Sequence, residues 1–280
     1  MELRREEESR KINLGTEVTE LVTWVMLLSN VVAFVSGAGQ GLGRATAIHL
    51  AKKNAKVILA DLSNDKLIEV AKLIGSDNVI AAPVDVTSEE GVKAALGLGM
   101  EKWGKVNVVV NCAGIAPPMR VLGKKGPHSL DQFIKVLNVN TVGTFNVVRL
   151  AAEKMSLNKP DNDGIRGVII NTASIAAMDG QIGQAAYAAS KGAVASMTLP
   201  IARDLASIGI RVNTIAPGLF LTPMLEGLPE QVRTDLASTV PLPKRLGKPE
   251  EYAKLVESII ENSMLNGEVI RLDGALRMQP

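Results

Sequence analysis

The stretch VVAFVSGAGQGLGRATAIHL, residues 31–50, combines three features that together decide a fold class. Val31–Val35 is a short apolar run of β-forming residues, as expected for a strand buried on both faces of a parallel sheet. A glycine-rich turn follows directly, and from about Leu42 onward the residues are those of a helix. A buried strand that passes through a tight turn into a helix is the first half of a βαβ unit.

The turn between this strand and this helix holds glycines at alternating positions, namely Gly37, Gly39, Gly41 and Gly43. Glycine lets the backbone approach a pyrophosphate, and the first N–H groups of the helix favour its negative charge. The spacing Gly37-x-x-x-Gly41-x-Gly43 differs from the G-x-G-x-x-G of many dinucleotide sites. We interpret the turn as a phosphate site, the alternative being a tight strand–helix turn that requires glycine for packing alone.

The alternation of apolar runs and helix-length segments continues to the C-terminus. Strands that alternate with helices indicate right-handed βαβ units and a parallel sheet. We therefore predict a single doubly wound Rossmann domain of the α/β class over residues 31–280, with a seven-stranded parallel sheet and a Pro- and Gly-rich excursion at about residues 218–247. The predicted strands are Val31–Val35, Lys56–Ala60, Asn78–Ala82, Val106–Val110, Gly167–Asn171, Ile210–Ile215 and Glu268–Leu272.

Residues 1–30 are predicted to be an N-terminal extension. The acids Glu2, Glu6, Glu7 and Glu8 argue against a mitochondrial transit peptide. Residues 21–39 carry no charge, yet Asn30 interrupts them and a buried strand explains their second half, so we do not predict a membrane span. Residues 21–28 remain open to two interpretations, a hydrophobic helix packed on the domain or a partner surface.

Composition excludes several classes of function. The chain has 280 residues, 46% of them hydrophobic, and a net charge of +2 with its basic residues dispersed, so it lacks the electrostatic footprint of a nucleic-acid-binding protein. Cys112 is the only cysteine, so an intrachain disulfide is impossible. The only histidines, His49 and His128, have no ligand partners at metal-site spacing, and we predict no metal.

The segment SIAAMDGQIGQAAYAASK, residues 174–191, carries the candidate chemistry. Tyr187 and Lys191 are spaced i, i+4 on a predicted helix, so they share a face. A nearby cation lowers the pKa of a phenol and makes it useful for acid–base catalysis. Ser174, at the end of a predicted strand, can reach the same point. These groups suit a substrate alcohol or carbonyl; the alternative is a buried tyrosine with a solvated lysine.

Polar and small residues end the neighbouring strands. Asp61 ends the second strand, where a carboxylate accepts hydrogen bonds from the adenosine ribose and repels a 2′-phosphate, which favours NAD over NADP. Asp85 and Val86 follow the third strand, where an adenine would lie. The small residues of Asn111-Cys112-Ala113-Gly114, after the fourth strand, would let a cofactor lie against the backbone.

In order and spacing, the motifs SGAGQGLG, NCAG, NVNTVG with Asn140, Ser174, YAASK and Pro217-Gly218 resemble those of the short-chain dehydrogenase/reductase family. The resemblance implies that Tyr187 is the acid/base, that Lys191 supports it, that Ser174 orients the substrate oxygen and that Asn140 serves a water-linked proton relay. Ser36 and Cys112 stand where many members have Thr and Asn. The implied cofactor contacts are Ser36, Gly37, Gln40, Gly41, Leu42, Gly43, Asp61, Asp85, Val86, Asn111, Ala113, Gly114, Tyr187, Lys191, Pro217, Gly218, Phe220 and Thr222.

A closer similarity, carried by RGVIINTAS, GQAAYAASKG, TIAPGLF and NGEVIRLDGALRMQP, is to family members that oxidise 3-hydroxyacyl-CoA with NAD. It implies oxidation of the 3-hydroxyl of short-chain 3-hydroxyacyl-CoA, with a hydroxysteroid or secondary-alcohol dehydrogenase as the alternative. It also implies a homotetramer, a mitochondrial location and a possible non-catalytic role with a tRNA methyltransferase in tRNA processing. Residues 1–30 do not share the similarity, so a cytoplasmic location is the alternative.

Two loops are candidates for the substrate side. Cations after the fourth strand can meet the phosphates of CoA, although a solvated polar loop explains them equally. Gln181 and Gln184, before Tyr187, can hydrogen-bond a thioester or hydroxyl, or only their own loop; by resemblance Gln181 contacts substrate. The cations are Arg120, Lys124, Lys125 and His128.

The excursion after Pro217-Gly218 is rich in large apolar residues. They suit a lid that covers an acyl chain or a steroid and excludes water. The alternative is packing against another subunit. By resemblance, Leu225 contacts substrate. The apolar residues are Leu219, Phe220, Leu221, Met224, Leu225 and Leu228.

Overall fold

The apolar runs form one seven-stranded, all-parallel sheet in the computed structural model, which describes residues 26–280 except 76, 125 and 228. The spatial order is β3-β2-β1-β4-β7-β8-β9. The predicted fold class is confirmed, and each observed strand lies within two residues of its predicted bounds. The strands are β1 (Val32–Ser36), β2 (Lys56–Asp61), β3 (Val79–Pro83), β4 (Val108–Asn111), β7 (Gly167–Thr172), β8 (Ile210–Pro217) and β9 (Val269–Leu272).

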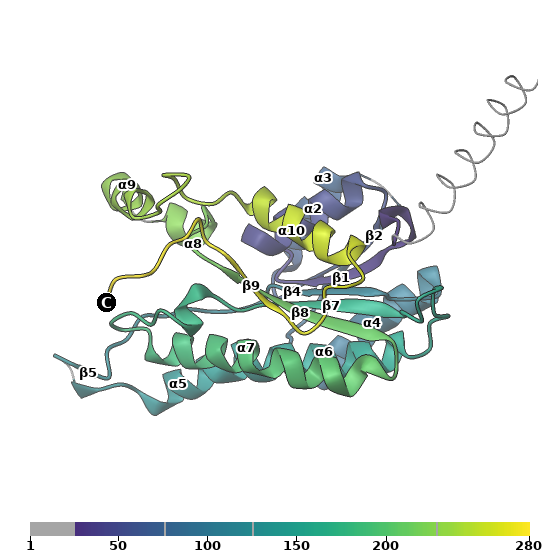
Figure 1. Ribbon diagram of the computed structural model, residues 1–280, viewed down its shortest axis with the longest axis horizontal. Coiled ribbons are helices and arrows are strands. Elements are labelled where there is room, and N and C mark those ends of the chain that lie inside the picture. Colours follow the sequence, from purple (N-terminus) through teal and green to yellow (C-terminus); the bar gives the residue numbers. More distant parts are fainter. Residues whose placement is uncertain (1–25, 76, 125, 228) are drawn as a thin grey trace, which may run out of the picture.

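Helices cover both faces of the sheet (Figure 1). Alternate residues of a strand point to opposite faces, so Ala33 and Val35 pack in one core while Val32 and Phe34 pack in the other. Both faces exclude water, which explains the unbroken apolar runs. One layer holds α2 (Gly41–Lys52), α3 (Asn64–Ile74) and α10 (Pro249–Glu261); the other holds α4 (Glu89–Trp103), α6 (Gly143–Met155) and α7 (Ala185–Ala206).

Local sequence explains where these helices begin and end. The Ser88 hydroxyl accepts a hydrogen bond from Gly91 N (3.0 Å) and caps α4. Gly75 ends α3 in the left-handed conformation, with φ of 62°. Pro249 occupies the first turn of α10, where its missing N–H costs nothing. The predicted helix through Tyr187 and Lys191 is present, and it continues past Pro200.

The order in which successive strands are added to the sheet reverses between β1 and β4. Strands β2 and β3 lie on one side of β1, and the later strands lie beyond β4. Ligands of open α/β sheets bind at this switch point, outside the carboxyl ends of the strands. Ser36 and Asn111, the last residues of β1 and β4, pair directly across it. The fold therefore places the glycine turn and the end of β4 side by side.

The segment that leads into β1 packs against the domain. A short 3₁₀ turn (η2, Leu28–Asn30) precedes β1, and Leu28 is buried while Met26 packs on the core of the α2 face. No helix among residues 26–280, less the three undescribed positions, is long and apolar enough to cross a membrane. Most of the predicted extension, residues 1–25, lies outside the described residues, and so does the first part of the apolar run at residues 21–28.

Two excursions from the sheet reach the same end of the molecule (Figure 1). After β4, a small antiparallel hairpin of β5 (Leu122–Gly123) and β6 (Gly126–Pro127) leads to α5 (Leu130–Leu137). After β8, the predicted loop-rich excursion contains the short helices α8 (Pro223–Glu226) and α9 (Glu230–Ser238).

Candidate active site at the carboxyl edge of the sheet

Three predicted groups meet beside the end of β7. Tyr187 and Lys191 lie one turn apart on α7, and the Lys191 ammonium is 5.8 Å from the centre of the Tyr187 ring. Ser174 precedes the 3₁₀ turn η4 (Ile175–Ala177) just after β7, and its hydroxyl lies close enough to the Tyr187 phenol to lower the pKa of that phenol. A phenol, an ammonium and a hydroxyl thus converge, as general acid–base work on an alcohol requires.

Burial controls the ionisation of these groups. It raises the pKa of the Tyr187 phenol above its usual value, and the nearby Ser174 hydroxyl opposes that rise. It also lowers the pKa of Lys191 to about 8. From the sequence we expected Lys191 to lower the phenol pKa. In this structure desolvation outweighs other influences, because both groups are buried and the ammonium donates to the Thr172 carbonyl (2.7 Å).

Thr172, the last residue of β7, was not identified from the sequence. Its carbonyl accepts from Lys191, while its hydroxyl shares a 2.7 Å hydrogen bond with the Tyr252 hydroxyl on α10. Tyr252 is completely buried, and burial raises its pKa well above the ordinary value. Breaking a hydrogen bond between two buried hydroxyls costs free energy, because neither group can bond to water instead. The Thr172–Tyr252 bond therefore fixes the end of β7, whose carbonyl holds Lys191.

Asn140 lies in a π-helical turn (η3, Asn138–Val142) between α5 and α6. Its amide nitrogen donates to the Ile115 carbonyl and to the Ser190 hydroxyl, both at 2.9 Å, and its amide oxygen accepts from Ile115 N (2.8 Å). These bonds fix the chain after β4 against α7. The side chain is thus committed to protein contacts, while the main-chain carbonyl accepts from the Thr144 hydroxyl (2.7 Å) and keeps a second lone pair.

The glycine turn fits a pyrophosphate. Gly37 and Gly41 have φ of 65° and 56°, values that side-chain-bearing residues rarely adopt. A Cβ on Gly37 would lie 2.8 Å from Ala113 N, and one on Gly43 would lie 2.3 Å from the Gly37 carbonyl. Gln40, the residue before α2, makes no side-chain cap, and no acidic residue occupies the first helical turn, so the helix dipole faces the crevice uncompensated. Leu42 lies half-buried in that turn.

The adenosine side of the crevice has a fixed carboxylate. Asp61, the last residue of β2, accepts from Gly39 N (3.0 Å) and from Ser63 N (3.2 Å). These bonds hold the carboxylate beside the glycine turn, where a ribose would lie.

The segment after β3 forms the next part of the wall. Asp85 accepts from the backbone N–H and the hydroxyl of Thr87 (2.9 and 2.7 Å), so it shapes its own loop. Val86 is buried against Gly143, whose Cβ would lie 2.7 Å from a Val86 methyl.

The side chain of Asn111 at the end of β4 makes hydrogen bonds within the sheet. The Asn111 amide donates to the Asn171 side chain (2.9 Å) and accepts from the Ser36 hydroxyl (3.3 Å). The side chain of Asn111 therefore links β4 to β1 and to β7. Ala113 N donates to Ser36 (3.3 Å), and a Cβ on Gly114 would lie 3.5 Å from Lys191 Nζ. Small residues here keep the space beside the ammonium open.

The sequence model described as short chain dehydrogenase matches residues 31–233. The chain belongs to this family. The 3-hydroxyacyl-CoA dehydrogenase type-2 of Drosophila melanogaster is 60% identical over 256 residues, which cover 91% of this chain and 100% of that protein. A crystal structure of 3-hydroxyacyl-CoA dehydrogenase type-2 from Mycobacterium avium has a TM-score of 0.86 at 40% identity and covers 89% of this chain and 97% of that one. A 7α-hydroxysteroid dehydrogenase complexed with NADH and a 7-oxo bile acid has a TM-score of 0.80 at 28% identity, with 89% and 95% coverage.

This short-chain dehydrogenase is therefore an NAD-dependent oxidoreductase, which confirms the predicted enzyme class and cofactor. The residues around the glycine turn fit the adenosine and pyrophosphate parts of NAD, and those around Lys191 fit the nicotinamide part. The uncapped helix and the left-handed glycines suit the pyrophosphate, and the open space beside the Lys191 ammonium suits the nicotinamide part.

The two ends of the predicted lid segment of the dehydrogenase, residues 218–247, are hydrogen-bonded to each other. Leu221 N donates to the Gly247 carbonyl and Gly247 N donates to the Leu219 carbonyl, both at 2.8 Å. Phe220 is buried against Gly247 rather than open to the crevice, so it anchors the base of the lid. Pro217 ends β8, and Gly218 follows it with its N–H bonded to the Leu272 carbonyl (2.9 Å).

The first lid helix lies beside the cofactor crevice. Thr222 precedes α8, and its methyl group would lie 3.4 Å from a Cβ on Gly41. Leu225, in α8, is half-buried. Leu228 lies outside the described residues. The start of α8 thus lies against the glycine turn, as a cover for the site requires.

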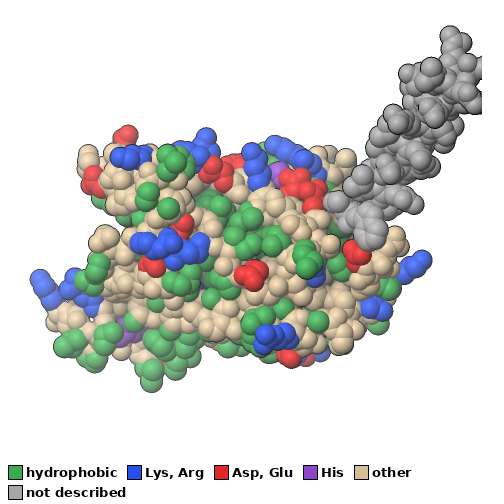
Figure 2. All heavy atoms as spheres, viewed as in Figure 1, with side chains coloured by type: hydrophobic (Ala, Val, Ile, Leu, Met, Phe, Trp, Pro, Cys, Tyr) green, Lys and Arg blue, Asp and Glu red, His purple; other side chains and the backbone are tan. Residues whose placement is uncertain are grey.

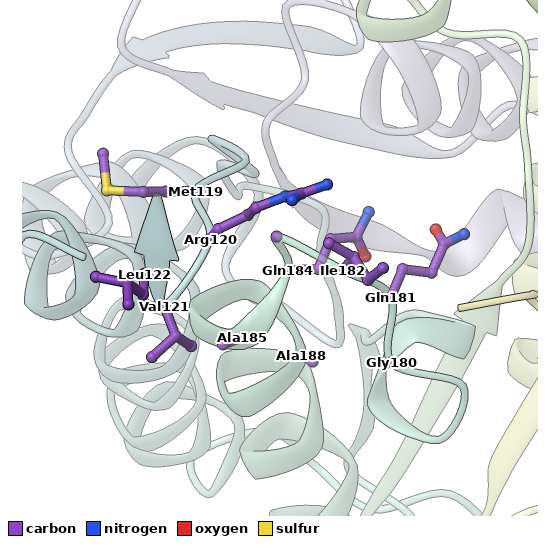
Figure 3. Close-up of a pocket in the computed structure, with 11 residues that line it drawn as sticks. Met119, Arg120, Val121, Leu122, Gly180, Gln181, Ile182, Gln184, Ala185 and Ala188 are labelled. Carbon is purple, nitrogen blue, oxygen red and sulfur yellow. The ribbon is translucent and has the colours of Figure 1, made fainter. Parts of the chain in front are cut away.

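A cavity of about 410 Å³ lies between the strap, our name for residues 119–128 with the β5–β6 hairpin, and the loop before α7 (Figure 3). Its walls are Met119–Leu122 on one side and residues 180–185 with Ala188 on the other, mostly apolar. Gln181 and Gln184 line it, and the Arg120 side chain extends across it towards Gln184 in Figure 3. The Gln184 amide oxygen is buried without a hydrogen-bond partner among the described residues, so this side chain of the cavity wall keeps an unused acceptor.

The cations of the strap are placed differently from one another. Arg120 lines the cavity and Lys124 is exposed on the hairpin. His128 Nδ1 lies 2.7 Å from the Ser129 carbonyl and the ring packs edge-on against Phe133. His128 therefore has a structural role at the start of α5, and Lys125 lies outside the described residues.

Proposed function

We propose that this dehydrogenase oxidises the 3-hydroxyl of short-chain 3-hydroxyacyl-CoA with NAD, reversibly. The convergence of Ser174, Tyr187 and Lys191 at the end of β7 carries the proposal. A mostly apolar cavity is lined by residues 180–185, which belong to the loop between Ser174 and Tyr187. Similarity to proteins named 3-hydroxyacyl-CoA dehydrogenase type-2, at 56–60% identity over at least 90% of this chain, supports the substrate class.

The residues of the site divide the chemistry between them. The phenolate form of Tyr187 takes the hydroxyl proton of the substrate and becomes the phenol, and the Ser174 hydroxyl donates a hydrogen bond to the substrate oxygen as it becomes a carbonyl. Lys191 supports the phenolate and holds its place through the Thr172 carbonyl. NAD, when bound, accepts the hydride from C3 of the substrate. Asn140 bonds both the loop after β4 and Ser190 of α7, so it fixes the position of this loop relative to the helix that carries Lys191.

A substrate panel tests the proposal. We expect the highest kcat/KM for 3-hydroxybutyryl-CoA or its 2-methyl derivative with NAD, and a much lower value for a hydroxysteroid, for a simple secondary alcohol and for NADP. A hydroxysteroid that is preferred over every acyl-CoA would reject the assignment of substrate class while leaving the dehydrogenase chemistry intact.

A second candidate, a hydroxysteroid or secondary-alcohol dehydrogenase, is favoured by the apolar character of the cavity and by the fold similarity to a 7α-hydroxysteroid dehydrogenase. The strap separates the two candidates, since only a CoA ester brings phosphates. If the acyl-CoA is the substrate, Arg120→Ala with Lys124→Ala raises its KM and weakens the dependence of KM on salt. The same variant leaves the KM of an uncharged alcohol unchanged under the second candidate.

We also infer a homo-oligomer, which the exposed apolar side chains around α5 and α6 support. Leu130 and Ile134 on α5 are 70% and 53% exposed, and Phe145 on α6 is 46% exposed. Apolar side chains gather in this region of the surface (Figure 2). Such a patch suits a partner copy. Light scattering on the purified chain tests this, and a strictly monomeric mass would reject it.

A further inference from the structure

The C-terminal segment after β9, residues 273–279, lies between the loop that carries Ser174 and the base of the lid (Figure 1). Its contacts connect the Ser174 loop to the base of the lid, two segments that are distant in the sequence. They involve ion pairs, main-chain hydrogen bonds and an apolar cluster, and each type points to the same role.

On the side of the catalytic loop, Asp179 is the anchor. Arg271 of β9 donates to both Asp179 oxygens (2.6 and 3.3 Å), and the same guanidinium reaches the Leu276 carbonyl (2.8 Å). Met278 N also approaches Asp179 (3.4 Å). Asp179 lies five residues after Ser174, and its side chain is only 14% exposed. This bidentate, half-buried pair is of the strong kind.

Beyond Asp179, the tail reaches the cavity wall itself. The Gln181 amide nitrogen donates to the main-chain carbonyl of Gln279 (2.9 Å). Gln181 lines the cavity, so its orientation depends on the last residues of the chain.

On the side of the lid, the tail touches both ends of the segment. A Cβ on Gly218 would lie 2.8 Å from Asp273 Cβ, and one on Gly274 would lie 2.7 Å from a Val240 methyl. Leu242 N donates to the Gly274 carbonyl (3.3 Å). Such close approach leaves the lid base no room to shift independently of the tail.

An apolar cluster completes the link. Leu276, only 3% exposed, packs with Ile175, the residue after Ser174, and with Val240 of the lid. Leu219 and Met278 pack against the same cluster. One small core therefore contains members of the catalytic loop, the lid and the tail.

We propose that residues 273–279 form a C-terminal clasp that fixes the spacing between the Ser174 loop and the lid base and so sets the room left for an acyl chain between these two segments. Its residues are positioning and specificity-determining residues, and none of them contacts the reacting atoms. The inference rests on the proposed oxidation of 3-hydroxyacyl-CoA. A clasp that holds two walls apart by a fixed distance restricts which acyl chains reach Tyr187 in a reactive geometry.

The test uses the full chain with Asp179→Asn, Met278→Ala and the double substitution, which weaken the ionic and the apolar halves of the clasp. Gln279→Ala is the matched control because it keeps the main-chain carbonyl that Gln181 binds. For the double variant we expect KM for 3-hydroxybutyryl-CoA to rise about tenfold and the discrimination against 3-hydroxyoctanoyl-CoA to fall, with KM for NAD within about twofold of the wild type. Circular dichroism verifies that each variant is folded.

Hydrogen exchange gives a readout that does not depend on the substrate. Residues 175–184 and 218–247 should exchange faster in the double variant and at the wild-type rate in Gln279→Ala. A folded double variant with unchanged KM and unchanged chain-length preference overturns the clasp. If the wild type rejects 3-hydroxyacyl-CoA, the proposed function fails. The clasp is then tested separately, by comparing the wild type with the double variant in their KM for the alcohol that the enzyme accepts and in hydrogen exchange at the two segments.

Discussion

The Lys191 ammonium lies 5.8 Å from the centre of the Tyr187 ring while donating to the Thr172 carbonyl at 2.7 Å. The cation is therefore held by the sheet, not by the phenol, and its distance from the phenol is set by the end of β7. Burial in this arrangement raises the pKa of Tyr187 and lowers the pKa of Lys191, and both shifts have consequences that depend on pH.

The buried cation should make stability depend on pH. Burial lowers the pKa of Lys191 from 10.5 to about 8, so the unfolded chain binds its proton more tightly and the folded state is penalised below pH 8. In Lys191→Met that penalty is absent. The stability of the wild type relative to the variant should thus rise by roughly 3 kcal/mol between pH 8 and 10.5. Urea unfolding across that window measures it, and a pH-independent difference would contradict a buried ammonium.

Ser174 should affect both rate and pH dependence. Its hydroxyl lowers the pKa of Tyr187, so Ser174→Ala should move the tyrosine limb of the kcat/KM profile to higher pH. The rate at neutral pH should fall by about 10²–10³-fold, because a donor to the reacting oxygen is lost. Ser174→Thr retains the hydroxyl and should recover part of the rate; equal defects in both variants would argue against a hydroxyl-specific role.

Asp61 should determine the choice of cofactor. Its carboxylate is fixed beside the glycine turn by the Gly39 N–H. Asp61→Asn keeps the shape but removes the charge that repels a 2′-phosphate, so the NAD to NADP ratio of kcat/KM should fall about tenfold or more. The control is Asp65→Asn, an exposed carboxylate in the first turn of α3. An unaltered ratio in the Asp61 variant would place the ribose elsewhere.

Arg211 should be important for stability but not for catalysis. Its buried guanidinium donates to the Ile259, Ile260, Asn262 and Leu265 carbonyls at the end of α10. Arg211→Met removes four hydrogen bonds to these carbonyls, although Leu265 still accepts from the Asn213 amide and Asn262 from Leu265 N. It should cost about 2–4 kcal/mol of unfolding free energy, with KM values unchanged. Arg203→Met, at an exposed position, should stay within about 0.5 kcal/mol. Denaturant unfolding compares the two.

The sequence predicted those parts of the fold that local pattern controls. Apolar runs such as Val108–Asn111 are strands because both faces of the sheet are covered, and the i, i+4 spacing of Tyr187 and Lys191 placed them on one helix face. The helix α9 was not predicted because none of its described side chains is buried, so it carries no apolar stripe.

Contacts between distant residues were beyond the reach of local pattern. Thr172 and Tyr252 are 80 residues apart, and Arg271 and Asp179 are 92 apart, so nothing in their neighbourhoods indicated a pair. Asn111 illustrates the same limit, because its motif does not show that the fold uses its side chain to bond Asn171 across the sheet. The direction of the Tyr187 pKa shift also depends on burial, which a motif does not report.

The most direct measurement is single-turnover formation of NADH from 3-hydroxybutyryl-CoA by wild type and Tyr187→Phe, with NAD binding followed in parallel. The phenyl ring keeps the packing while the proton acceptor is lost, so we predict the same NAD affinity and a rate reduced by about 10³-fold or more. A variant that binds NAD normally and retains a tenth of the wild-type rate would contradict Tyr187 as the acid/base at this site.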